Sequence, residues 1–354
     1  MKIGFDAKRY FNNSSGLGNY ARWLVDGLAK RQKFEYHLYQ PKEVSQKVDL
    51  PLHYPSGIGK ATPSLWRSKF VCSRLETDKI DIFHGLSNEI PFGIHKTNIK
   101  SVVTIHDLIN KRYPENYGPV DRIIYNKKLY YAQKYAAKII TPSQQTKEDI
   151  ITFYGTTADK IEVVPLSLQK KTFTIEASGM DSEYMLCVSG FTKRKNIPQL
   201  VKAYTALENC STKLIIAGHD GDSFKEVQQL ASTNPNIILR QNVEAKELNT
   251  LYQNALFCVY PSVFEGFGIP ILEAFSFGKT VATSNISSMP EVGGDAAVYF
   301  DPTDTTSISS ALEKLLIPKN RNALEERIVD RLAAFETQKL LNRYEEIYEE
   351  LLLQ

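Results

Sequence analysis

Two glutamates, Glu265 and Glu273, flank a glycine-containing bend in the stretch FEGFGIPILEAF, with seven residues between them. The apolar run ALFCVYPS before them predicts a strand, and Ile269 to Phe277 predicts a helix, which puts Glu265 in a loop and Glu273 early in the helix. Carboxylates on both sides of such a bend can accept hydrogen bonds from paired hydroxyl groups, which sugars and riboses offer. The pattern therefore indicates either a site for a polar ligand or a capped helix with one exposed acid.

A histidine and an aspartate, His106 and Asp107, end the apolar run SVVTIHD. Open α/β sheets bind their ligands beyond the carboxyl ends of the strands, so both side chains are candidates for chemistry. His84, which ends DIFHG, is a second and weaker candidate for a substrate contact. A single histidine in such a place is as readily a hydrogen-bonded structural residue, and the residues themselves leave both interpretations open.

Two glycines in SSGLGNYA, Gly16 and Gly18, fit the G-x-G-x-x-A pattern of dinucleotide-binding loops. The match is weak, because residues 8–15 separate the strand KIGFDA from Gly16 and the next strand, EYHLYQ, has no acid at its carboxyl end. An NAD(P)-dependent oxidoreductase is therefore disfavoured. The aspartates of DGD at 220–222 resemble a metal motif, but Asp and Gly are common turn formers, so we expect a turn and no metal site.

Strand-like runs alternate with amphipathic helical stretches along the whole chain, which is typical of parallel sheets built from βαβ units. Six such strands lie on each side of a polar stretch without periodicity. We expect an α/β protein of two doubly wound, Rossmann-like domains at 1–167 and 184–335, a linker at 168–183, and a C-terminal helix at 336–354. The parallel sheets are expected to face each other across a cleft that holds the site.

The composition is that of an ordinary globular protein, with 354 residues of which 42% are hydrophobic and 23% charged. Residues 1–171 carry 27 Lys and Arg against 16 Asp and Glu, whereas the rest carries 16 against 24. This asymmetry indicates an anionic partner for the first half, such as a phosphorylated acceptor or lipid headgroups, although a solvated surface explains it equally well. The four cysteines lack metal-ligand spacing and no apolar run is long enough to cross a bilayer, so we expect a cytoplasmic protein with reduced thiols.

The stretch PSVFEGFGIPILEAFSFGKTVATSNISSMPEVGGDAAVYFDP closely resembles the nucleotide-sugar region of retaining glycosyltransferases of family 4, whose mark is two glutamates separated by seven residues. GLGNYARWL, VTIHDLI, KIITPSQQTKEDI, VSGFTKRKNIPQLVKAY and ELNTLYQNALFCVYPS extend the resemblance over nearly the whole chain. The resemblance implies the GT-B fold, with a C-terminal helix that crosses back onto the first domain. It also implies that the enzyme needs no cofactor or metal ion and takes a nucleotide diphosphate sugar as its donor substrate.

The resemblance gives roles to residues of the second half. Glu265 would contact the hydroxyls of the transferred sugar, and Glu273 would hold the ribose hydroxyls. Arg194 and Lys195, in FTKRKN after the first strand of the second domain, would stabilise the charge that builds on the departing diphosphate, although three adjacent cations are by themselves more often a solvated loop. Three residues would line the pocket with their backbone: Phe267, Gly268 and Ile269.

In the first half, the resemblance implies that His106 reaches the donor sugar close to the acceptor, and that Gly16 and Gly18 face the diphosphate and the acceptor. Two regions depart from the family pattern. Gly190 stands where an arginine often assists the phosphates. In LRQNVEAKEL the family's frequent glycine is replaced, with Asn242 and Val243 near the expected nucleobase pocket, so the base is left open.

We expect a retaining glycosyltransferase that moves a hexosyl group, in the first place mannosyl, to a saccharide or lipid-linked acceptor in surface polysaccharide or glycan biosynthesis. The RKN form of the phosphate loop resembles that of mannosyl-type transferases, so GDP-mannose is the first expectation for the donor and a UDP-sugar the second. A noncatalytic nucleotide-sugar binding protein and a GT-B nucleotide-sugar epimerase are the alternatives.

Basic and aromatic residues interleave in PSLWRSKF (63–70) and DRIIYNKKLYYAQKYAAK (121–138). In a first domain this pattern favours contact with the acceptor or peripheral contact with an anionic membrane over binding of nucleic acid. An ordinary helix with one solvated face explains it equally well.

Overall fold

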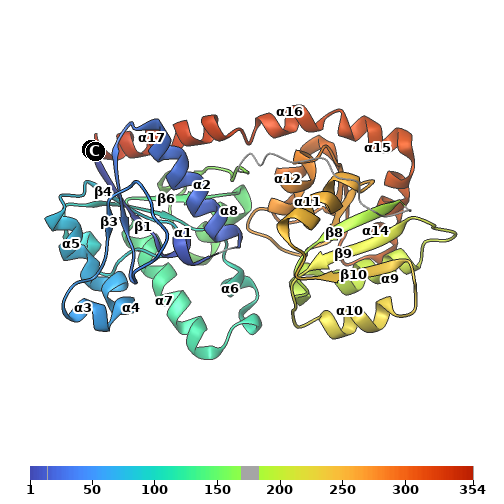
Figure 1. Ribbon diagram of the computed structural model, residues 1–354, viewed down its shortest axis with the longest axis horizontal. Helices are drawn as coiled ribbons and strands as arrows, with labels where there is room; N and C mark the ends of the chain where they lie inside the picture. Colours follow the sequence, from blue (N-terminus) through green and yellow to red (C-terminus); the bar gives the residue numbers. More distant parts are fainter. Residues whose placement is uncertain (14, 169–182, 354) are drawn as a thin grey trace. The chain divides into compact units, whose positions relative to one another are not determined.

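The computed structural model describes residues 1–13, 15–168 and 183–353, and the chain divides into two compact units (Figure 1). Unit 1 comprises Met1–Gln169 together with Glu336–Gln354, and unit 2 comprises Lys170–Phe335. The linker predicted at 168–183 lies outside the described residues, apart from its two end positions. Among the described residues, no helix combines the length and the apolar character that crossing a bilayer requires.

Unit 1 is built on a seven-stranded sheet in which all neighbouring strands are parallel, in the order β3-β2-β1-β4-β5-β6-β7. Central strands such as β5 are almost wholly buried, as expected for a parallel sheet covered by helices on both faces. The strands are β1 (Lys2–Asp6), β2 (Glu35–Tyr39), β3 (Leu52–His53), β4 (Ile82–Gly85), β5 (Lys100–Thr104), β6 (Lys138–Thr141) and β7 (Ile161–Val163).

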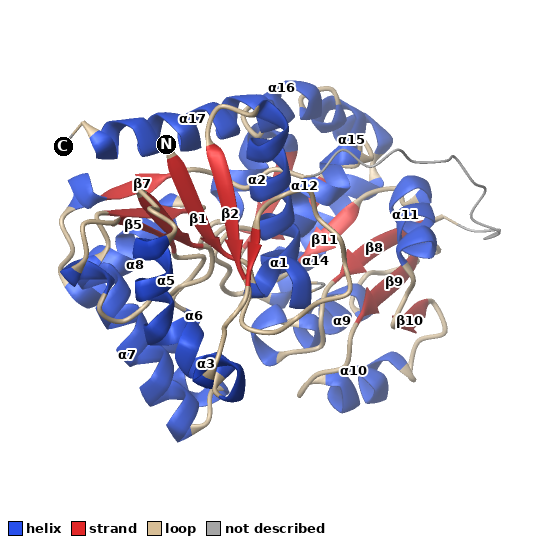
Figure 2. Cartoon of the chain, turned by 60° about the vertical axis from the view of Figure 1, so that its left-hand side comes forward, coloured by secondary structure: helices blue, strands red, loops and turns tan. Residues whose placement is uncertain are grey.

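Helices cover both faces of this sheet (Figure 2). Phe83 of β4 points to the face where Leu129 and Ile150 pack, whereas the next residue, His84, points to the opposite face and contacts Tyr348. The helices of unit 1 are α1 (Lys8–Asn12), α2 (Gly16–Arg31), α3 (Ile58–Ala61), α4 (Pro63–Leu65), α5 (Val71–Thr77), α6 (Ile109–Arg112), α7 (Pro119–Tyr135), α8 (Gln144–Tyr154) and α17 (Thr337–Leu352).

The C-terminal helix α17 is part of unit 1, where it packs on α2. Three of its side chains, Leu341, Tyr344 and Tyr348, are fully buried. The hydroxyl of Tyr348 is hydrogen-bonded to Nδ1 of His84 at 2.7 Å, and the hydroxyls of Tyr344 and Tyr20 lie 3.0 Å apart. The last helix of the chain therefore completes the core of the first unit.

Unit 2 contains a six-stranded parallel sheet in the order β10-β9-β8-β11-β12-β13. Its strands are β8 (Tyr184–Val188), β9 (Lys213–Gly218), β10 (Ile237–Gln241), β11 (Cys258–Tyr260), β12 (Val281–Ser284) and β13 (Ala297–Phe300). Its helices are α9 (Ile197–Thr205), α10 (Phe224–Ala231), α11 (Ala245–Asn254), α12 (Ile269–Ser276), α13 (Met289–Gly293), α14 (Thr305–Leu316), α15 (Pro318–Glu325) and α16 (Ile328–Ala333). Both units therefore have the predicted doubly wound architecture, and the twelve predicted strands are present; among the described residues, only the two-residue β3 was not predicted.

In each sheet, the order in which the chain adds new strands reverses once, at a topological switch point. In unit 1 the chain adds β2 and β3 on one side of β1 and then continues with β4 on the other side, and in unit 2 the change falls between β8 and β11. Loops that leave two such strands diverge, and this leaves room for a ligand beyond their carboxyl ends. In unit 2 these are the loops that carry the predicted cations and Glu265.

The hydrogen bond between His84 and Tyr348 leads to a prediction about stability. The substitution Tyr348→Phe removes the hydroxyl and leaves a ring nitrogen buried without this partner, which is expected to destabilise unit 1 by about 1–3 kcal/mol. Urea unfolding followed by tryptophan fluorescence tests this, since both tryptophans of the chain, Trp23 and Trp66, lie in unit 1. Tyr125→Phe, at an exposed tyrosine, is the control, and equal midpoints for the two variants would contradict the role of the bond.

Candidate active site

In unit 2, an ion-pair cluster joins the two loops that diverge at the switch point. Arg194 and Lys195 belong to a 3₁₀ turn, Lys193–Lys195, that follows β8, and Glu265 follows β11. The Nη1 atom of Arg194 lies 2.6 Å from Oε1 of Glu265, and Nζ of Lys195 lies 2.7 Å from the same oxygen. The amide of Val263 also donates to the carbonyl oxygen of Arg194 at 3.0 Å. The fold thus brings three of the four predicted catalytic residues into contact.

Glu265 is a buried carboxylate that stays charged. Burial by itself would raise the pKa of Glu265, but the charges of Lys195 and Arg194 outweigh it and lower this pKa to about 2. The Nζ atom of Lys195 also donates to the hydroxyl of Tyr260 at 2.7 Å, and Arg194 donates to the carbonyl oxygen of Phe264. Two cations thus share one acid in a site whose three charged side chains are only 11–17% exposed. A second anion would neutralise the surplus positive charge.

The loop between Glu265 and α12 is held by two serines from a distant segment. The hydroxyl of Ser287 accepts from the amide of Glu265 at 3.1 Å and donates to its carbonyl oxygen at 2.8 Å. The hydroxyl of Ser288 lies 2.5 Å from the carbonyl oxygen of Phe267, whose own side chain is buried. Gly268 has a φ of 122°, a conformation that side chains rarely adopt. The loop therefore presents backbone rather than side chains as it enters α12 at Ile269.

Glu273 lies in the second turn of α12 and is half-buried. The hydroxyl of Tyr252 donates to its Oε2 atom at 3.0 Å, and the ring of Tyr252 is stacked on Phe277 with the centroids 5.3 Å apart. The carboxylate is thus oriented by a buried tyrosine, which suits a group that must accept hydrogen bonds from a ligand in one fixed direction.

The positions that depart from the family pattern lie around the same sheet edge. At Gly190 an added Cβ atom would meet nothing closer than 4.0 Å, so the site has room for a larger residue. Asn242 is exposed with a φ of 52°, its side chain lies 3.1 Å from Nδ1 of His219, and its neighbour Val243 is half-buried. Gly190 follows the end of β8, His219 follows β9, and Asn242 and Val243 follow β10.

The aspartates of DGD form a turn, as predicted. The carboxylate of Asp222 accepts from the amide of Lys193 at 2.8 Å, and that of Asp220 accepts from the amide of Gly221 at 2.8 Å. Asp222 thereby braces the first residue of the cationic turn. Among the described residues, no cluster of three or more His, Cys, Asp or Glu side chains could hold a metal ion.

In unit 1, His106 lies two residues beyond the end of β5 and has one ring nitrogen fixed. Its Nε2 atom lies 2.9 Å from the carbonyl oxygen of Leu86, which can only accept, so Nε2 carries the proton and Nδ1 is the acceptor of the neutral ring. The ring meets Tyr20 edge-on with the centroids 4.7 Å apart. Burial lowers the pKa of His106 to about 4, which keeps it neutral near pH 7. A neutral, oriented histidine can accept a hydrogen bond from a sugar hydroxyl.

His84 has a structural role in place of the expected substrate contact. It is fully buried, and its two ring nitrogens are taken by the hydroxyls of Tyr348, at 2.7 Å, and Thr104, at 2.8 Å. Burial, reinforced by the nearby His106, lowers the pKa of His84 to about 3. This side chain belongs to the core that attaches α17 and has no free nitrogen to offer a ligand.

The remaining candidates of unit 1 lie at helix starts. The carboxylate of Asp107 accepts from the amide of Ile109 at 3.1 Å, at the start of α6. Gly16 and Gly18 form the first turn of α2 rather than a loop. Gly16 is exposed, whereas a Cβ atom at Gly18 would lie 1.8 Å from the carbonyl oxygen of Asn13, so this position needs glycine for packing. A ligand at this edge would meet the N-terminus of α2.

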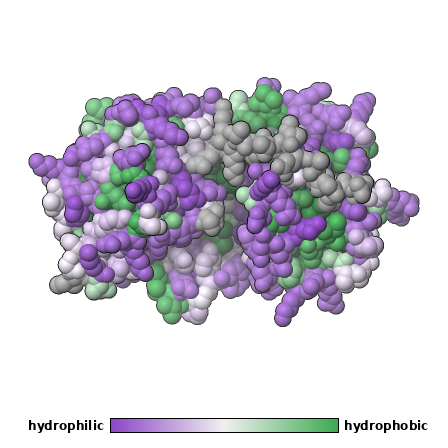
Figure 3. Space-filling model, in the orientation of Figure 1, coloured by the Kyte–Doolittle hydropathy of each residue, from purple (hydrophilic) through white to green (hydrophobic). Residues whose placement is uncertain are grey.

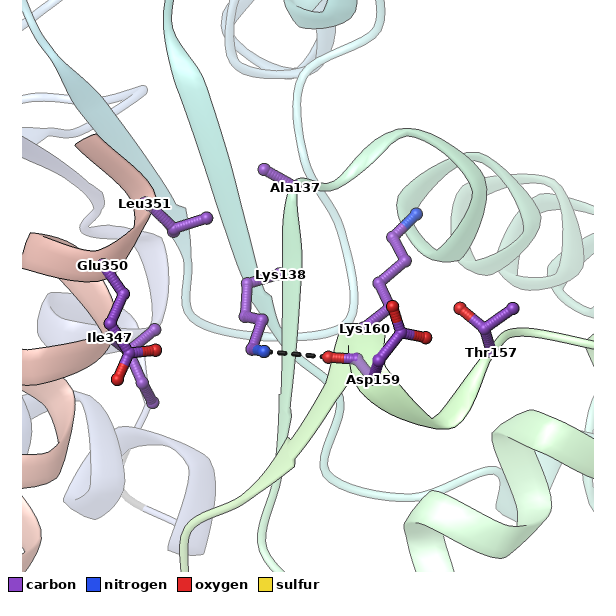
Figure 4. A pocket seen from close by; sticks show the side chains of 8 residues that line it. All are labelled: Ala137, Lys138, Thr157, Asp159, Lys160, Ile347, Glu350 and Leu351. Carbon is purple, nitrogen blue, oxygen red and sulfur yellow. Dashed lines mark hydrogen bonds between the residues drawn. The ribbon is translucent and has the colours of Figure 1, made fainter. Parts of the chain in front are cut away.

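A hollow of about 290 Å³ in unit 1 lies at the opposite end of the sheet, where β6 and β7 begin (Figure 4). Its two lysines are bound to backbone carbonyls, with Lys138 donating to Asp159 at 2.9 Å and Lys160 to Gln133 at 2.8 Å. The hollow lies away from the carboxyl ends of the strands, and we assign it no part in the site.

The sequence did not single out several residues that position the site: Tyr260, which binds Lys195, Tyr252, which binds Glu273, and Ser287 and Ser288, which hold the loop. The position of Tyr260 at the carboxyl end of an apolar strand was a signal that could have singled it out. The two serines lie more than twenty residues after Glu265, and no local pattern connects them with it.

Comparison with known families and proteins gives concordant matches. Residues 169–330 match the family described as glycosyl transferases group 1, and residues 14–167 match glycosyltransferase family 4. The O-antigen chain mannosyltransferase B of Escherichia coli is 33% identical over 347 residues, covering 88% of this chain and 89% of that protein. The O-antigen chain mannosyltransferase RfbU of Salmonella typhimurium is 28% identical, covering 60% of each chain.

Solved structures show the same fold at low identity. Sucrose-phosphate synthase from Thermosynechococcus elongatus superimposes with a TM-score of 0.78 at 16% identity, covering 100% of this chain and 99% of that one. WaaG, a glycosyltransferase involved in lipopolysaccharide biosynthesis, gives a TM-score of 0.72 at 16% identity, covering 98% and 99%. These similarities confirm the predicted GT-B fold.

The buried histidines lead to a prediction about pH. In the unfolded chain both His84 and His106 would titrate near pH 6.5, whereas folding lowers their pKa values to about 3 and 4. The unfolded chain therefore binds more protons below pH 6.5, and the free energy of unfolding is expected to fall as the pH decreases from 6.5 towards 4. His53, whose pKa is also lowered by burial, adds to this trend.

Urea midpoints from tryptophan fluorescence between pH 7.5 and 5 test this expectation. This pH range excludes the titration of Glu265. The low pKa of Glu265 stabilises the folded chain above pH 4.5, and this contribution is lost only as the pH falls from 4.5 towards 2. His106→Asn removes one of the buried rings and is expected to flatten the decline. A midpoint that stays constant over the window would show that the rings are not held neutral.

Proposed function

This chain belongs to the glycosyltransferases of group 1 and family 4, and on that premise we propose that it moves a mannosyl group from a nucleotide diphosphate sugar to a saccharide acceptor with retention of the anomeric configuration. The observation that carries the proposal is the cluster of Arg194, Lys195 and Glu265, in which two cations share one buried acid. The cluster has one positive charge more than its acid can neutralise, and a diphosphate is an anion that can pair with it. Retention is the outcome that the family resemblance implies.

The chemistry of transfer suits this cluster. Departure of the nucleotide leaves negative charge on the diphosphate, and preformed cations in a poorly solvated site stabilise that charge without having to reorganise. Arg194 and Lys195 are held by Glu265 and Tyr260 before a donor arrives. When the diphosphate pairs with the cations, an oxygen of Glu265 can turn to the hydroxyls of the sugar, and Glu273 can bind the ribose.

The acceptor is assigned to unit 1. There the Nδ1 atom of the neutral His106 is the acceptor of the ring and can orient a sugar hydroxyl. In a same-face reaction an oxygen of the leaving phosphate accepts the proton of the attacking hydroxyl, so His106 has a positioning task and no proton to carry. Catalysis then depends on alignment and charge stabilisation.

GDP-mannose is the first choice of donor and a UDP-sugar the second. The names of the two bacterial relatives, both O-antigen chain mannosyltransferases, support a mannosyl donor and a role in surface polysaccharide assembly. We place the enzyme in the cytoplasm, at the inner face of the membrane. No cofactor or metal is required in this proposal, because the two cations take the part of a metal ion.

Two other activities would use the same site. A noncatalytic nucleotide-sugar binding protein would bind the donor without turnover, and a nucleotide-sugar epimerase would interconvert donors without an acceptor. Analysis of products with and without saccharide acceptors separates the three, since only a transferase makes nucleotide release depend on the acceptor.

The cationic turn offers a test with a matched control. Lys195→Ala is expected to lower kcat/KM for GDP-mannose by about a hundredfold or more, because a charge that stabilises the leaving diphosphate is lost. Lys193→Ala, in the same turn but with an exposed side chain, is expected to retain activity. Nucleotide release across a panel of GDP- and UDP-sugars provides the measurement, and equal losses in the two variants would refute the assignment.

Glu265→Gln is expected to abolish most of the activity as well. The same substitution leaves two cations without their shared acid, so unit 2 should lose about 3 kcal/mol of stability. Assays must therefore be run well below the melting temperature of the variant, with circular dichroism as a check of folding. A folded and fully active Glu265→Gln enzyme would rule out the assigned role.

Stereochemistry tests the proposed course of the reaction. With an α-linked donor such as GDP-mannose, the product is expected to carry a new α-linkage, which the one-bond carbon–proton coupling at the anomeric carbon reports in NMR spectra. A β-linked product would demand direct inversion and would remove the same-face mechanism while leaving the transferase assignment intact.

A further inference from the structure

A second ion-pair cluster lies at the switch point of unit 1. Asp6 is the last residue of β1, and Glu89 follows the neighbouring strand β4. Arg67 joins the two acids: its Nε atom lies 2.9 Å from both carboxylate oxygens of Asp6, and its Nη2 atom lies 2.5 Å from Oε1 of Glu89. Ligands of open α/β sheets bind where the loops diverge at such a point. The cluster therefore lies where a ligand of unit 1 is expected.

The two cations of this cluster turn inward from segments in which basic and aromatic residues interleave. Arg67 belongs to a π-helical turn, Trp66–Phe70, and its side chain is only 9% exposed. Lys128 reaches Glu89 from α7, with Nζ 2.7 Å from Oε2. Figure 3 shows hydrophobic surface at the lower edge of unit 1, in the region where α7 lies in Figure 1, whereas Lys128 is half-buried. A solvated basic surface therefore explains neither cation, and π-helical turns are frequent at functional sites.

The cluster lines a small cavity and has hydrogen-bonding capacity to spare. The cavity has a volume of about 10 Å³, room for roughly one water-sized group, and is lined by Asp6, Arg67 and Glu89. Arg67 uses its Nε and Nη2 atoms to bind Asp6, and no hydrogen bond of its Nη1 atom is found within the described residues. A carboxylate offers about four lone-pair positions, so Glu89 can accept further hydrogen bonds. A hydroxyl group in this cavity can thus donate to Glu89 and accept from Arg67.

The charged side chains that face the cavity stay ionised. Burial by itself would lower the pKa of Arg67, but Asp6 and Glu89 outweigh it and raise this pKa. Burial would raise the pKa of Glu89, but Arg67 and Lys128 outweigh it and lower this pKa. Glu89 is therefore a carboxylate near pH 7, and hydrogen bonds to a charged acceptor are stronger than those to a neutral one.

The charges of the cluster balance, unlike those in unit 2. Asp6 and Glu89 are matched by Arg67 and Lys128, whereas in unit 2 two cations share a single acid. Lys8 lies nearby, but it is exposed and forms no ion pair with either acid within the described residues. A cluster without surplus positive charge suits the hydroxyl groups of a neutral sugar better than a phosphate or a carboxylate.

The loop that carries Glu89 also fixes His106. The carbonyl oxygen of Leu86 accepts from Nε2 of His106 at 2.9 Å, and the side chain of Asn88 accepts from the amide of His106, also at 2.9 Å. A Cβ atom at Gly85 would clash with the carbonyl oxygen of Glu89, so the loop folds tightly over the end of β4. Glu89 and the histidine assigned to a sugar hydroxyl therefore lie at the same edge of the sheet and are held by one loop.

We propose that Glu89 and Arg67 determine the acceptor specificity of the enzyme by binding hydroxyl groups of an uncharged sugar, next to the hydroxyl that His106 orients. This inference rests on the proposed function for the reaction but not for the binding of a saccharide to unit 1. A purely structural ion pair is the competing explanation, since buried pairs also occur without a ligand. A structural pair, however, would leave the choice between neutral and charged acceptors unchanged when Glu89 loses its charge.

Acceptor selectivity of the full-length enzyme tests the proposal. Methyl α-mannopyranoside and its uronic acid counterpart differ only in the carboxylate at carbon 6, and the corresponding glucosides extend the panel. The wild type is expected to use the neutral glycosides at least about tenfold better in kcat/KM, because an anion would meet Glu89 without a spare cation. Glu89→Gln is expected to raise KM for the neutral glycosides about tenfold, to leave KM for GDP-mannose unchanged, and to reduce the discrimination against the uronic acids.

Two further variants serve as controls. Glu89→Asp keeps the charge and is expected to retain the preference for neutral glycosides. Glu76→Gln removes the same charge from an exposed position of α5 and should behave like the wild type. Circular dichroism confirms that each variant is folded at the assay temperature. Equal selectivity of folded Glu89→Gln and Glu76→Gln would overturn the proposal, and so would a wild type that prefers the uronic acids.

Binding measurements separate this inference from the proposed function. Saturation-transfer NMR detects the methyl glycosides on the protein without any donor, and the neutral ones are expected to bind to the wild type and to lose binding in Glu89→Gln. If they bind through Glu89 but no donor is turned over, the saccharide site stands and the proposed activity fails. If transfer occurs but no neutral glycoside depends on Glu89, the activity stands and the assigned specificity is refuted. Absence of binding of every neutral glycoside to the wild type would also refute it.

Discussion

The shared pairing of Glu265 with Arg194 and Lys195 is the interaction on which the organisation of unit 2 depends. A buried carboxylate without these cations would cost several kcal/mol, and cations without the carboxylate would repel each other at the diverging loops. The pairing therefore fixes both loops at the switch point before any ligand arrives. One acid neutralises only one of the two cations, so the cluster that stabilises the loops still carries a net positive charge. This charge favours binding of a further anion, and the same ion pairs therefore contribute to both stability and anion binding.

In unit 1, the candidate residue His106 is held in place by neutral hydrogen bonds rather than by ion pairs. His84 and His106 are neutral because burial lowers the pKa of each ring, and each is oriented by oxygen atoms of the protein. Tyr348 of α17 holds His84 from the far end of the sequence, and His84 in turn lies close enough to His106 to disfavour its own protonation. The C-terminal helix thus supports the edge of the sheet that carries His106, although it contributes no side chain to the candidate site.

The sequence was most informative where local pattern determines structure. Alternating apolar runs predicted the doubly wound sheets, and the family resemblance assigned Glu265, Arg194 and Lys195 to one donor site, although it did not predict their mutual ion pairs. Prediction failed where distant contacts decide the outcome. His84 and His106 both end apolar strands, and the structural ring differs from the candidate one by its bonds to the hydroxyls of Thr104 and of Tyr348, which lies 264 residues away. The strand β3 pairs with β2 through only two residues, too few to form a recognisable pattern.

Net charge and local charge have different meanings in this chain. Residues 172–354 carry an excess of acids, yet they contain the cationic cluster that suits a diphosphate, whereas the excess of bases in residues 1–171 includes the exposed cations of α7. Screening confines the effect of an exposed charge to about 10 Å in salt solution, while a nearly buried pair of cations acts at contact distance. The net charge of each half therefore describes the exposed surface that this half presents to large partners. The chemistry of its site is set by the few charges that the fold removes from water.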